Sequence, residues 1–337
     1  MARIRLEDVA KIAGVSMKTV SNVVHDYPHV SPGMRERVQR VIDELGYRPN
    51  ALGRRLATGK TGLLALAFAD VSIPYFSELA RVVSAAARSR GYRLLLEQTD
   101  GTLDGERAVL SESEAGLVDG VLFQPSVMSS TEIAKHRSDV PLVLLGEASA
   151  PLSVDHVMID NIAAASEATQ HLAALGRSRI GFVGHEEPRQ SETSRQRLIG
   201  YQEGLEKAGL RLDMSLLLPS YAVSAEAAAQ AVGAALERGL RFDALVCRDD
   251  LAAIGTLRAL KERGFDVPRD VAVTGWDNIS LTSYTYPSLT TIAADTAGLA
   301  EKALDMLSER IAGFEGLGRH TIVDYRLIPR ESAPAAT

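Results

Sequence analysis

Cysteine and long apolar segments are the scarcest features of this 337-residue chain. Cys247 is its single cysteine, so an intramolecular disulfide is impossible and metal sites built on several thiolates are excluded. No run of 18 apolar residues occurs, and the opening segment MARIRLEDVA lacks the apolar core of a signal peptide. We therefore expect a cytoplasmic protein with no cofactor and no membrane partner.

The signature motifs of common α/β enzymes are also missing. The chain contains no G-x-S-x-G elbow, no phosphate-binding G-x-x-x-x-G-K-[ST] loop and no zinc-binding H-E-x-x-H. Its seven histidines are scattered without the spacing of metal ligands. We therefore expect a protein that is not an enzyme, with neither catalytic nor metal-binding residues.

Charge is distributed unevenly along the chain. Residues 1–60 hold 11 Lys and Arg against six Asp and Glu, a balance of +5, whereas the remainder holds 26 against 37, a balance of −11. A basic segment on an acidic body is typical of a polyanion-binding module joined to a part that avoids DNA. The charge pattern therefore favours nucleic acid as a partner of the first 60 residues.

Three short helices are predicted in the basic segment. Apolar residues at helical spacing place them at residues 6–13, 17 to about 25, and 32–45. Gly14 and Gly46 end the first and third helices, while Ser16 and Ser31 are favourable N-caps for the second and third. A helix, a tight glycine-containing turn and a second helix make a helix-turn-helix unit.

The second helix of such a unit enters the DNA major groove by its N-terminal end. Met17 and Lys18 then face base edges, with Asn22 one turn further along the same side. Lys18 can donate to guanine O6 and N7, Asn22 can bridge adenine N6 and N7, and Met17 offers an apolar contact to a thymine methyl. Three further side chains are placed to bond phosphates: Thr19, Ser21 and His29. A three-helix bundle without a DNA role would explain the apolar faces but not the basic balance.

The runs LEDVAKIAGVSMKTVSNVV and HVSPGMRERVQRVIDELGYRPN resemble the head of the lactose/galactose repressor (LacI–GalR) family nearly position by position. This resemblance continues to the end of the chain and implies a bacterial transcription factor. Arg5 stands where the family usually has a Thr or Ser cap, so the first helix must rely on Glu7 and Asp8 at its N-terminus. Asn22 replaces the family's usual arginine, which we expect to shift base preference.

Residues 49–61 are predicted to form a hinge and linker. The stretch up to Leu56 is helix-prone, but a helix of about eight residues is too short to persist alone in water. The resemblance implies that this stretch folds only on the operator, pairs across a dimer and inserts Leu56 into the minor groove as a wedge. A passive linker is the alternative. The DNA-binding residues assigned to this segment are Asn50, Arg54, Arg55 and Leu56.

From residue 62 onward, short apolar runs alternate with helical stretches, from GLLALAFA to VAVTGWDN. Such alternation predicts parallel sheets wound with helices. The pattern pauses near Asp160-Asn161 and restarts, which indicates two similar lobes. The expected fold is an all-α helix-turn-helix head plus an α/β body of two doubly wound parallel-sheet lobes. By resemblance, the lobes are periplasmic-binding-protein-like and linked by three crossings.

The expected domains are a helix-turn-helix domain at 1–48, the hinge at 49–61 and an effector-binding body at 62–337. Within the body, one lobe covers about 62–160 and 293–323, and the other covers about 161–290 and 324–332. The chain ends in APAAT without terminal heptads, so a coiled-coil tetramer is not expected. A homodimer is expected, because two operator half-sites require two-fold symmetry.

In open α/β sheets, ligands bind beyond the carboxyl ends of the strands. The residues that follow the predicted strands, together with nearby helix starts, are rich in carboxylates and aromatic rings. Charged side chains recognise vicinal hydroxyls through strong hydrogen bonds, while aromatic faces stack on apolar ring surfaces. This inventory indicates a sugar or polyol effector. The predicted effector site comprises Asp70, Tyr75, Phe76, Gln124, Glu147, Asp160, Arg197, Asp249, Trp276 and Asp277.

Simpler structural roles are open to several of these residues. Carboxylates that follow strands often cap helices, which would explain Asp70, Asp160 and Asp250. Tyr75 and Phe76 could belong to the core. By resemblance, two positions hold effector in the family, namely those of Arg197 and Asp277. The position of Asp249, usually asparagine, does so as well, and its change to aspartate suggests a different effector or hydrogen-bond polarity.

The sequence therefore predicts a sequence-specific DNA-binding regulator, a repressor whose affinity for a pseudo-palindromic operator is controlled by an effector between two lobes. The favoured effector is a sugar or polyol that acts as inducer. One alternative is a corepressor-dependent regulator that senses a nucleobase or another metabolite. Another is a transport-type solute-binding protein, against which the basic head argues. A regulator of this kind is expected on the bacterial nucleoid.

Overall fold

The computed structural model describes residues 4–24, 27–47, 60–113, 116–135, 140–147, 150–185 and 191–335. The chain divides into two compact units, residues 1–61 and 62–337. Each unit has its own hydrophobic core. Across the described ranges, no helix is both long and apolar enough to span a bilayer.

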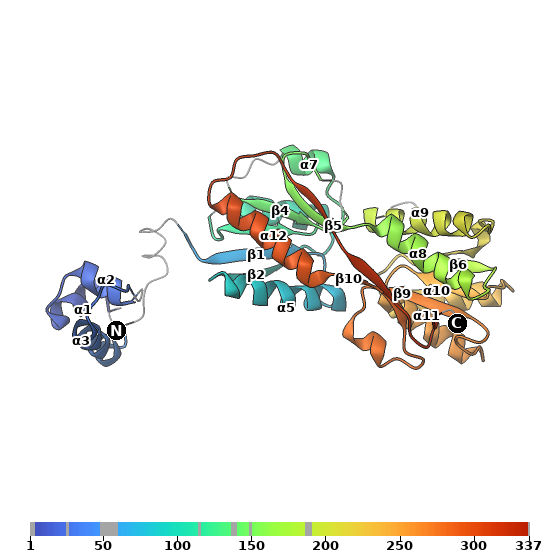
Figure 1. The fold of residues 1–337 in the computed structure, drawn as a ribbon, viewed down its shortest axis with the longest axis horizontal. Coiled ribbons are helices and arrows are strands. Elements are labelled where there is room, and N and C mark those ends of the chain that lie inside the picture. The colour runs from blue at the N-terminus through green and yellow to red at the C-terminus, as the bar shows by residue number, and fades with distance from the viewer. Residues whose placement is uncertain are drawn as a thin grey trace. The chain divides into compact units, whose positions relative to one another are not determined.

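The described part of the first unit is a bundle of three helices (Figure 1). The bounds are α1 (Leu6–Ala13), α2 (Met17–Val24) and α3 (Pro32–Leu45), which confirms the three predicted helices. Gly14 and Gly46 follow α1 and α3 with φ of 64° and 61°, the left-handed conformation that glycine adopts without steric cost. Val9, Val20 and Val38, one from each helix, are fully buried and hold the bundle together.

The N-terminal caps of α1 and α2 follow the sequence prediction. Arg5 has no side-chain oxygen that could cap α1. The Asp8 side chain caps the helix start instead, because its Oδ2 accepts from the Arg5 backbone N–H at 2.7 Å. In α2 the Thr19 backbone N–H donates to Ser16 Oγ at 3.1 Å. Both bonds satisfy donors that a helix terminus leaves without a partner. Ser16 thereby fixes the start of the helix predicted to read DNA.

Within the described part of the second unit, two six-stranded sheets form the two lobes (Figure 1). The strand order of the first sheet is β11-β5-β4-β3-β1-β2, and all its pairs are parallel. Its strands are β1 (Leu63–Phe68), β2 (Arg93–Gln98), β3 (Gly120–Phe123), β4 (Leu142–Leu145), β5 (Asp155–Ile159) and β11 (His320–Val323). Its helices are α5 (Pro74–Ser89), α6 (Leu103–Ser113), α7 (Ser130–Lys135) and α12 (Thr296–Ile311).

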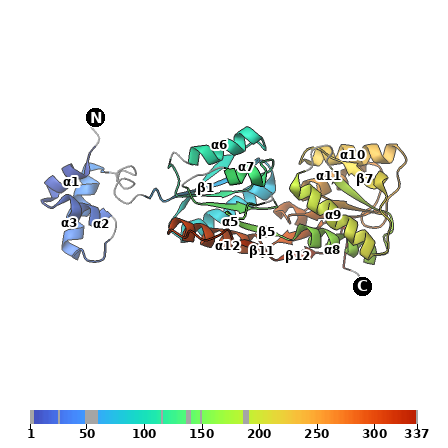
Figure 2. The same ribbon diagram turned by 90° about the horizontal axis from the view of Figure 1, so that it is seen from above.

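Helices cover both faces of this sheet, α5 and α12 on one side and α6 and α7 on the other (Figure 2). Strand β1 shows why. Leu64 and Leu66 pack in the core with α5 and α12, whereas Ala65 and Ala67 pack in the core with α6 and α7. A strand buried on both faces reads as a continuous apolar run, which is how the segment LLALAF appears in the sequence.

The second sheet has the order β12-β10-β9-β8-β6-β7. Its strands are β6 (Ile180–His185), β7 (Leu217–Pro219), β8 (Ala244–Cys247), β9 (Ala272–Trp276), β10 (Thr290–Ala294) and β12 (Tyr325–Ile328). Its helical elements are α8 (Asn161–Ala174), α9 (Glu192–Lys207), η1 (Met214–Leu216), α10 (Ala225–Glu237), α11 (Asp250–Glu262) and η2 (Ser280–Ser283). All its pairs are parallel except β10 with β12, so an antiparallel edge strand completes a sheet predicted as parallel.

The chain crosses between the lobes three times, as predicted. The crossings run from β5 to α8, from β10 to α12 and from β11 to β12. Only Asp324 separates β11 in the first sheet from β12 in the second. Short connections of this kind join the lobes but do not fix their relative orientation. Side-chain contacts between the lobes must do so.

A buried carboxylate fastens the strands next to the crossings. Asp155 at the start of β5 is fully buried and accepts hydrogen bonds from Arg310 and Arg319, the shortest at 2.9 Å from each guanidinium. Burial alone raises the pKa of Asp155, but the two guanidinium groups outweigh it and hold this pKa well below the usual range. The cluster links β5 to α12 and to the segment before β11.

Replacement of this carboxylate is expected to destabilise the body in a pH-dependent way. Removing one partner of a buried ion pair costs about 3–5 kcal/mol. Asp155→Asn should therefore lower the free energy of unfolding at pH 7 by about that amount, which is measured as a lower urea midpoint. A depressed pKa stabilises the fold above the ordinary carboxyl pKa of about 3.9 and loses that effect as pH falls, so the difference should shrink near pH 3. Asp305→Asn, in an exposed ion pair with Arg90, is the control. Equal effects of both variants would contradict the prediction.

Candidate functional site

The N-terminal end of α2 presents the side chains that were predicted to read DNA. Met17 and Lys18 are exposed, while Asn22 is half-buried. Met17 leaves 55% of its surface open although Val20 and Val23 of the same helix are buried. An apolar side chain left open at the first position of a helix is consistent with a contact made by a partner. The Asn22 carbonyl, in the last turn of α2, accepts from the Tyr27 N–H at 2.8 Å.

The predicted phosphate contacts lie around the same helix. Thr19 and Ser21 are half-buried, and His29 is exposed in the loop that follows. The Thr19 hydroxyl lies 2.9 Å from that of Ser16, and the His29 ring meets Tyr27 edge-on at 5.4 Å between centroids. The remaining predicted DNA contacts lie outside the described residues: Asn50, Arg54, Arg55 and Leu56.

Lys18 gives the sharpest test of base reading. Loss of a base-edge contact costs about 1–3 kcal/mol at one position of the site, so Lys18→Ala should relax preference at one symmetric base-pair position only. Lys11→Ala, an exposed lysine in the last turn of α1, is the matched control and should not change preference. Competition binding against operators substituted at each position measures both variants. A Lys18→Ala protein that keeps every preference would show that Lys18 does not read a base.

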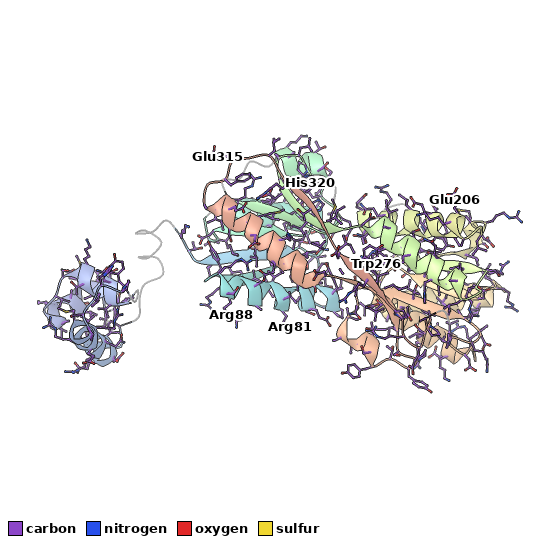
Figure 3. The ribbon with its side chains drawn as sticks, viewed as in Figure 1. Arg81, Arg88, Glu206, Trp276, Glu315 and His320 are labelled. Carbon is purple, nitrogen blue, oxygen red and sulfur yellow. The ribbon has the colours of Figure 1, made fainter. Side chains whose placement is uncertain are left out.

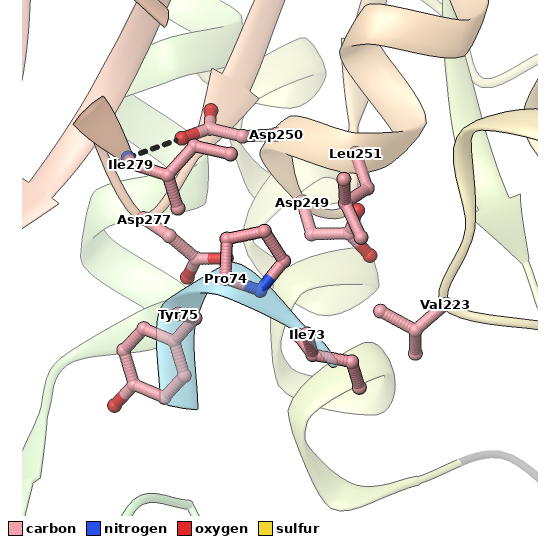
Figure 4. Close-up of a pocket in the computed structure, with 9 residues that line it drawn as sticks. All are labelled: Ile73, Pro74, Tyr75, Val223, Asp249, Asp250, Leu251, Asp277 and Ile279. Atoms are coloured by element: carbon pink, nitrogen blue, oxygen red, sulfur yellow. Dashed lines mark hydrogen bonds between the residues drawn. The ribbon is translucent and has the colours of Figure 1, made fainter. Parts of the chain in front are cut away.

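A pocket lies in the second unit between the two lobes (Figure 4). The first lobe contributes the start of α5, and the second contributes the residues that follow β8 and β9. The space that it leaves for the centres of water-sized molecules is about 10 Å³. The residues that line it are Ile73, Pro74, Tyr75, Val223, Asp249, Asp250, Leu251, Asp277 and Ile279. Three predicted effector residues therefore meet here, namely Tyr75, Asp249 and Asp277.

Arg197 of α9 is the buried cation beside this pocket, with 7% of its surface exposed. Its Nε donates to Asn161 Oδ1 at 2.9 Å, and its Nη1 donates to the Arg248 carbonyl at 2.6 Å. The guanidinium carbon lies 4.1 Å from the centre of the Trp276 ring, within the range of a cation–π contact. Trp276 lies at the junction of the lobes (Figure 3) and is almost fully buried, so it fixes the guanidinium rather than lining the pocket.

Glu147 after β4 connects the two lobes. Its Oε1 accepts from Asn161 Nδ2 at 2.9 Å, and its Oε2 accepts from the Thr193 hydroxyl at 2.7 Å. Asn161 begins α8 and Thr193 lies in the first turn of α9, both in the second lobe. Because Asn161 also accepts from Arg197, a chain of hydrogen bonds runs from the first lobe to the buried cation of the second.

Asp249 has two partners that hold it at the pocket. Its Oδ1 accepts from the Ala252 N–H at 2.7 Å and so caps α11. Its Oδ2 accepts from Arg248 Nε at 3.0 Å. The Arg248 side chain also donates to the backbone carbonyls of Gly184, Ser220 and Ala222. The Arg248 side chain thus makes its hydrogen bonds within the protein and orients Asp249.

Asp250 and Asp277 are buried carboxylates with raised pKa values. Burial raises the pKa of Asp250 to about 7, although its carboxylate accepts from the Thr291 hydroxyl at 2.7 Å and the Ile279 N–H at 2.9 Å. Burial also raises the pKa of Asp277 well above its usual range, with Arg197 opposing and neighbouring carboxylates adding. The nearest cation to Asp277 is Arg197 Nη2 at 3.9 Å from Oδ1, too long for a hydrogen bond.

The backbone holds Asp277 in an unusual conformation. Its φ is 107°, and that of Asn278 is 53°. A non-glycine residue there costs about 1–3 kcal/mol and persists where the surroundings over-determine it, often at functional sites. The Asp277 N–H donates to the Ile292 carbonyl at 2.9 Å. The turn after β9 therefore keeps the carboxylate at the pocket.

The first lobe contributes one aromatic ring to the pocket. Tyr75, in the first turn of α5, is half-buried and bonded to Gln124. Burial raises the pKa of its hydroxyl, and the charges of Glu147 and Asp277 add to that effect. Gln124 follows β3 and is packed tightly against Gly146, where any side chain would collide with it. Gln124 thus positions the tyrosine.

Seven predicted effector residues are not among those that line the described pocket. Gln124, Glu147, Arg197 and Trp276 make the contacts given above, and the other three have structural roles. Phe76 stacks on Phe68 at 5.1 Å between ring centroids and belongs to the core. Asp160 is exposed and caps α8 by accepting from the Ala163 N–H at 2.9 Å. Asp70 accepts from the Ser72 N–H at 2.8 Å in the turn after β1. The contacts of Phe76 and Asp160 match the structural alternatives raised from the sequence, whereas Asp70 stabilises a turn and does not cap a helix.

Several residues of the site were not assigned from the sequence. Asn161 opens α8 immediately after Asp160, so the strand-end signal was present one residue away. Arg248 and Asp250 stood in the run that follows β8, but only Asp249 was assigned. In the described ranges, no cluster of three or more histidine, cysteine or acidic side chains is arranged to hold a metal ion.

Both units of the chain are similar to known protein families. A family model described as "Bacterial regulatory proteins, lacI family" matches residues 5–50, and one described as "Periplasmic binding protein-like domain" matches residues 169–333. The transcriptional regulator CelR of Thermobifida fusca is 32% identical and aligns over 97% of this chain and 97% of its own. The relatives found are transcriptional regulators rather than enzymes.

Two solved structures extend the comparison. The lac repressor dimer bound to operator and the anti-inducer ONPF superimposes with a TM-score of 0.86 at 25% identity, over 99% of this chain and 100% of that chain. The CelR–cellobiose complex gives 0.73 at 29% identity, over 98% and 100%. These matches confirm the resemblance drawn from the sequence and the predicted fold class. The chain therefore belongs to the lacI family of bacterial regulatory proteins and is a DNA-binding transcriptional regulator.

Proposed function

We propose that this regulator is a repressor whose operator affinity is set by a small polyhydroxylated effector in the pocket between its lobes. One observation carries the proposal: Asp249 and Asp277 line the pocket together with Tyr75. The buried side chain of Arg197 lies next to Asp277. Carboxylates accept from vicinal hydroxyls, and an aromatic ring packs against the apolar face of a sugar. The cellobiose complex of the similar regulator CelR supports a sugar as the effector class.

We propose a homodimer as the DNA-binding form. The similar lac repressor binds its operator as a dimer, and two half-sites require two-fold symmetry. Large exposed apolar side chains offer surface for such an interface. They are Leu95 and Leu96 on edge strand β2, and Leu281, Tyr284 and Tyr286 in and after η2.

Effector binding is proposed to act through the spacing of the lobes. The pocket leaves only about 10 Å³ for the centres of water-sized molecules, far below the ~300–1,000 Å³ of typical ligand sites, so a disaccharide requires the lobes to separate. Glu147 spans the lobes through Asn161 and Thr193, and these contacts would change with that movement. The movement would reach DNA through the proposed hinge, residues 49–61, with Leu56 as the wedge.

The proposed division of labour follows from these sites. Residues 1–48 bind the operator, and residues 62–337 bind the effector. The effector is proposed to loosen DNA, as an inducer does, and the protein is proposed to act on the nucleoid in the cytoplasm. Coupling between two such sites is typically about 1–3 kcal/mol.

Selection of genomic fragments by the purified protein tests the proposed DNA-binding role. Fragments that bind the full chain are sequenced, and the enriched motif is tested by fluorescence anisotropy. We expect one pseudo-palindromic motif, because a symmetric dimer places two α2 helices in successive major grooves. A motif without two-fold symmetry, or enrichment that depends on base composition alone, would rule out operator recognition of this kind.

A further inference from the structure

Among the residues that the structure describes, those that line the pocket between the lobes include acidic groups and no cationic group. Of its nine lining residues, Asp249, Asp250 and Asp277 are acidic and the other six carry no charge. Glu147 is a fourth carboxylate close enough to act on Asp277. A ligand that enters this pocket therefore meets hydrogen-bond acceptors with negative charge.

Both guanidinium groups nearby donate hydrogen bonds inside the protein, whereas Arg197 Nη2, 3.9 Å from Asp277 Oδ1, donates none to the described residues. Arg248 donates to Asp249 and to three backbone carbonyls. Arg197 donates to Asn161 and to the Arg248 carbonyl, and the Trp276 ring covers its face. Neither arginine is among the residues that line the pocket. An anionic effector such as a sugar phosphate would meet the three carboxylates of the lining beside a single guanidinium edge, Arg197 Nη2.

The acidic and basic groups around the pocket are unequal in number. The four carboxylates lie near two guanidinium groups, those of Arg197 and Arg248. If all of them were ionised, two negative charges would be in excess in a largely buried site. Burying an ionised carboxylate without a partner is costly, and the group responds by taking up a proton. Burial raises the pKa values of Asp250 and Asp277, and the neighbouring carboxylates raise them further. A neutral ligand would leave these groups inclined to hold a proton, whereas a cationic ligand would favour their ionised form.

Asp277 is the carboxylate most open to a ligand. Among the described residues its side chain shows no hydrogen bond, and its nearest cation lies 3.9 Å away. Only 13% of its side chain is exposed, so solvent compensates little. It lies beside Tyr75 and Pro74 in the pocket (Figure 4). A ligand donor that reaches Asp277 would form a hydrogen bond to a carboxylate that is already shielded from water.

We propose that the effector is a polyhydroxylated molecule that carries a protonated amine, an amino sugar, with its ammonium between Asp249 and Asp277. This inference rests on the proposed function and narrows its ligand class. Tyr75, Ile73, Pro74 and Val223 supply the surface against which a sugar ring packs. The ammonium is a compact charge with three donors, which matches a pair of carboxylate acceptors.

Matched pairs of sugars test the proposal by calorimetry on the full-length protein. The panel holds glucosamine, galactosamine and mannosamine beside the parent hexoses, and the disaccharide of chitosan beside cellobiose. N-acetylglucosamine is a neutral control with a substituent at the same carbon, and glucose 6-phosphate is an anionic one. An ion pair out of water is worth at least about 1.4 kcal/mol here, so one amine should bind roughly ten-fold tighter than its hydroxyl counterpart.

Asp249→Asn separates charge from shape. Asparagine has the same outline and caps a helix equally well, so α11 should remain capped. The amine preference should fall to about three-fold or less, because one of the two carboxylates that hold the ammonium is gone. Asp213→Asn is the matched control, since Asp213 caps η1 in the same lobe and does not line the pocket. It should keep the full preference.

Proton release gives a second readout. The groups that face Asp250 and Asp277 are Asp249, Glu147 and Arg197. A bound ammonium favours ionised carboxylates, so amine binding at about pH 6, where sugar amines are protonated, should release protons. Enthalpies measured in buffers of different ionisation enthalpy report that release. A neutral sugar should release none.

Two outcomes would overturn the inference. In one, no amine of the panel binds more tightly than its hydroxyl counterpart. In the other, Asp249→Asn keeps the full preference. If a neutral sugar alone changes operator affinity, the proposed function stands and this inference falls. If an amino sugar binds in the pocket without any effect on operator affinity, this inference stands and the proposed function falls.

Discussion

Removal of residues 1–61 is expected to abolish operator binding while the body keeps its ligand. The head holds a charge balance of +5 within residues 1–60, whereas the rest of the chain holds −11, so the body should repel DNA. Specific binding typically exceeds non-specific binding by about 10³–10⁷-fold, and the deletion removes both. The operator affinity of residues 62–337 should therefore fall by at least about 1,000-fold in an anisotropy titration.

The body is the right fragment for this test because it is a compact unit by itself. Residues 62–337 form one unit with both lobes and the pocket between them. Its ligand affinity should stay within about two-fold of that of the full chain, since no head residue lines the pocket. A body fragment that still binds operator would place DNA recognition outside α2. A fragment that unfolds by circular dichroism would call for a point-mutated head instead.

Arg197→Ala is expected to abolish the effector response and to leave operator binding in place. The side chain is buried, donates two hydrogen bonds and balances Asp277. Truncating one partner of a buried hydrogen-bonded charge costs about 2–5 kcal/mol, equal to roughly a 30- to 5,000-fold loss of ligand affinity. The readout is operator anisotropy with and without a sugar that stabilises the wild-type protein in a thermal-shift screen.

Two control variants, Arg195→Ala and Arg197→Lys, make the result for Arg197→Ala interpretable. Arg195→Ala removes an exposed arginine of the same helix whose partner is Glu192 at 2.5 Å; exposed pairs contribute about 0–1 kcal/mol, so its response should be normal. Arg197→Lys keeps the charge but not the planar fork that bonds Asn161 and the Arg248 carbonyl. It should fold and still respond poorly. A normal response from Arg197→Ala would show that the effector site lies elsewhere.

Much of the fold could be predicted because local chemistry and global structure agree. The helices of the head follow from apolar spacing, from Ser16 as a cap and from Gly14 and Gly46 as stops. The short apolar runs of the body became strands because both faces of each sheet are covered. The exception is β12, which pairs antiparallel with β10. Its direction depends on the third crossing, a tertiary feature that no local pattern encodes.

The site was predicted in part, for a geometric reason. The rule that ligands bind beyond strand ends identifies segments but not the direction of each side chain. Successive helical residues point about 100° apart, so Tyr75 lines the pocket while Phe76 packs on Phe68. The same rotation makes Asp160 an exposed cap and turns Asn161 toward Arg197.

The role of Arg248 could not be inferred from sequence spacing. Its backbone carbonyl accepts from Arg197, while its side chain holds Asp249 and reaches carbonyls up to 64 residues away. Gly184 permits this approach, because a side chain there would press on Arg248. Contacts between distant segments arise only when the second sheet has formed.

The most direct test of the whole account is the operator dissociation constant measured with and without saturating effector, together with its reciprocal. With the ligand that the sugar screen identifies, operator binding should weaken by roughly 5- to 150-fold, as a coupling of about 1–3 kcal/mol requires. Thermodynamic linkage demands that saturating operator weaken ligand binding by the same factor. An operator affinity unchanged by a ligand that occupies the pocket would contradict the account.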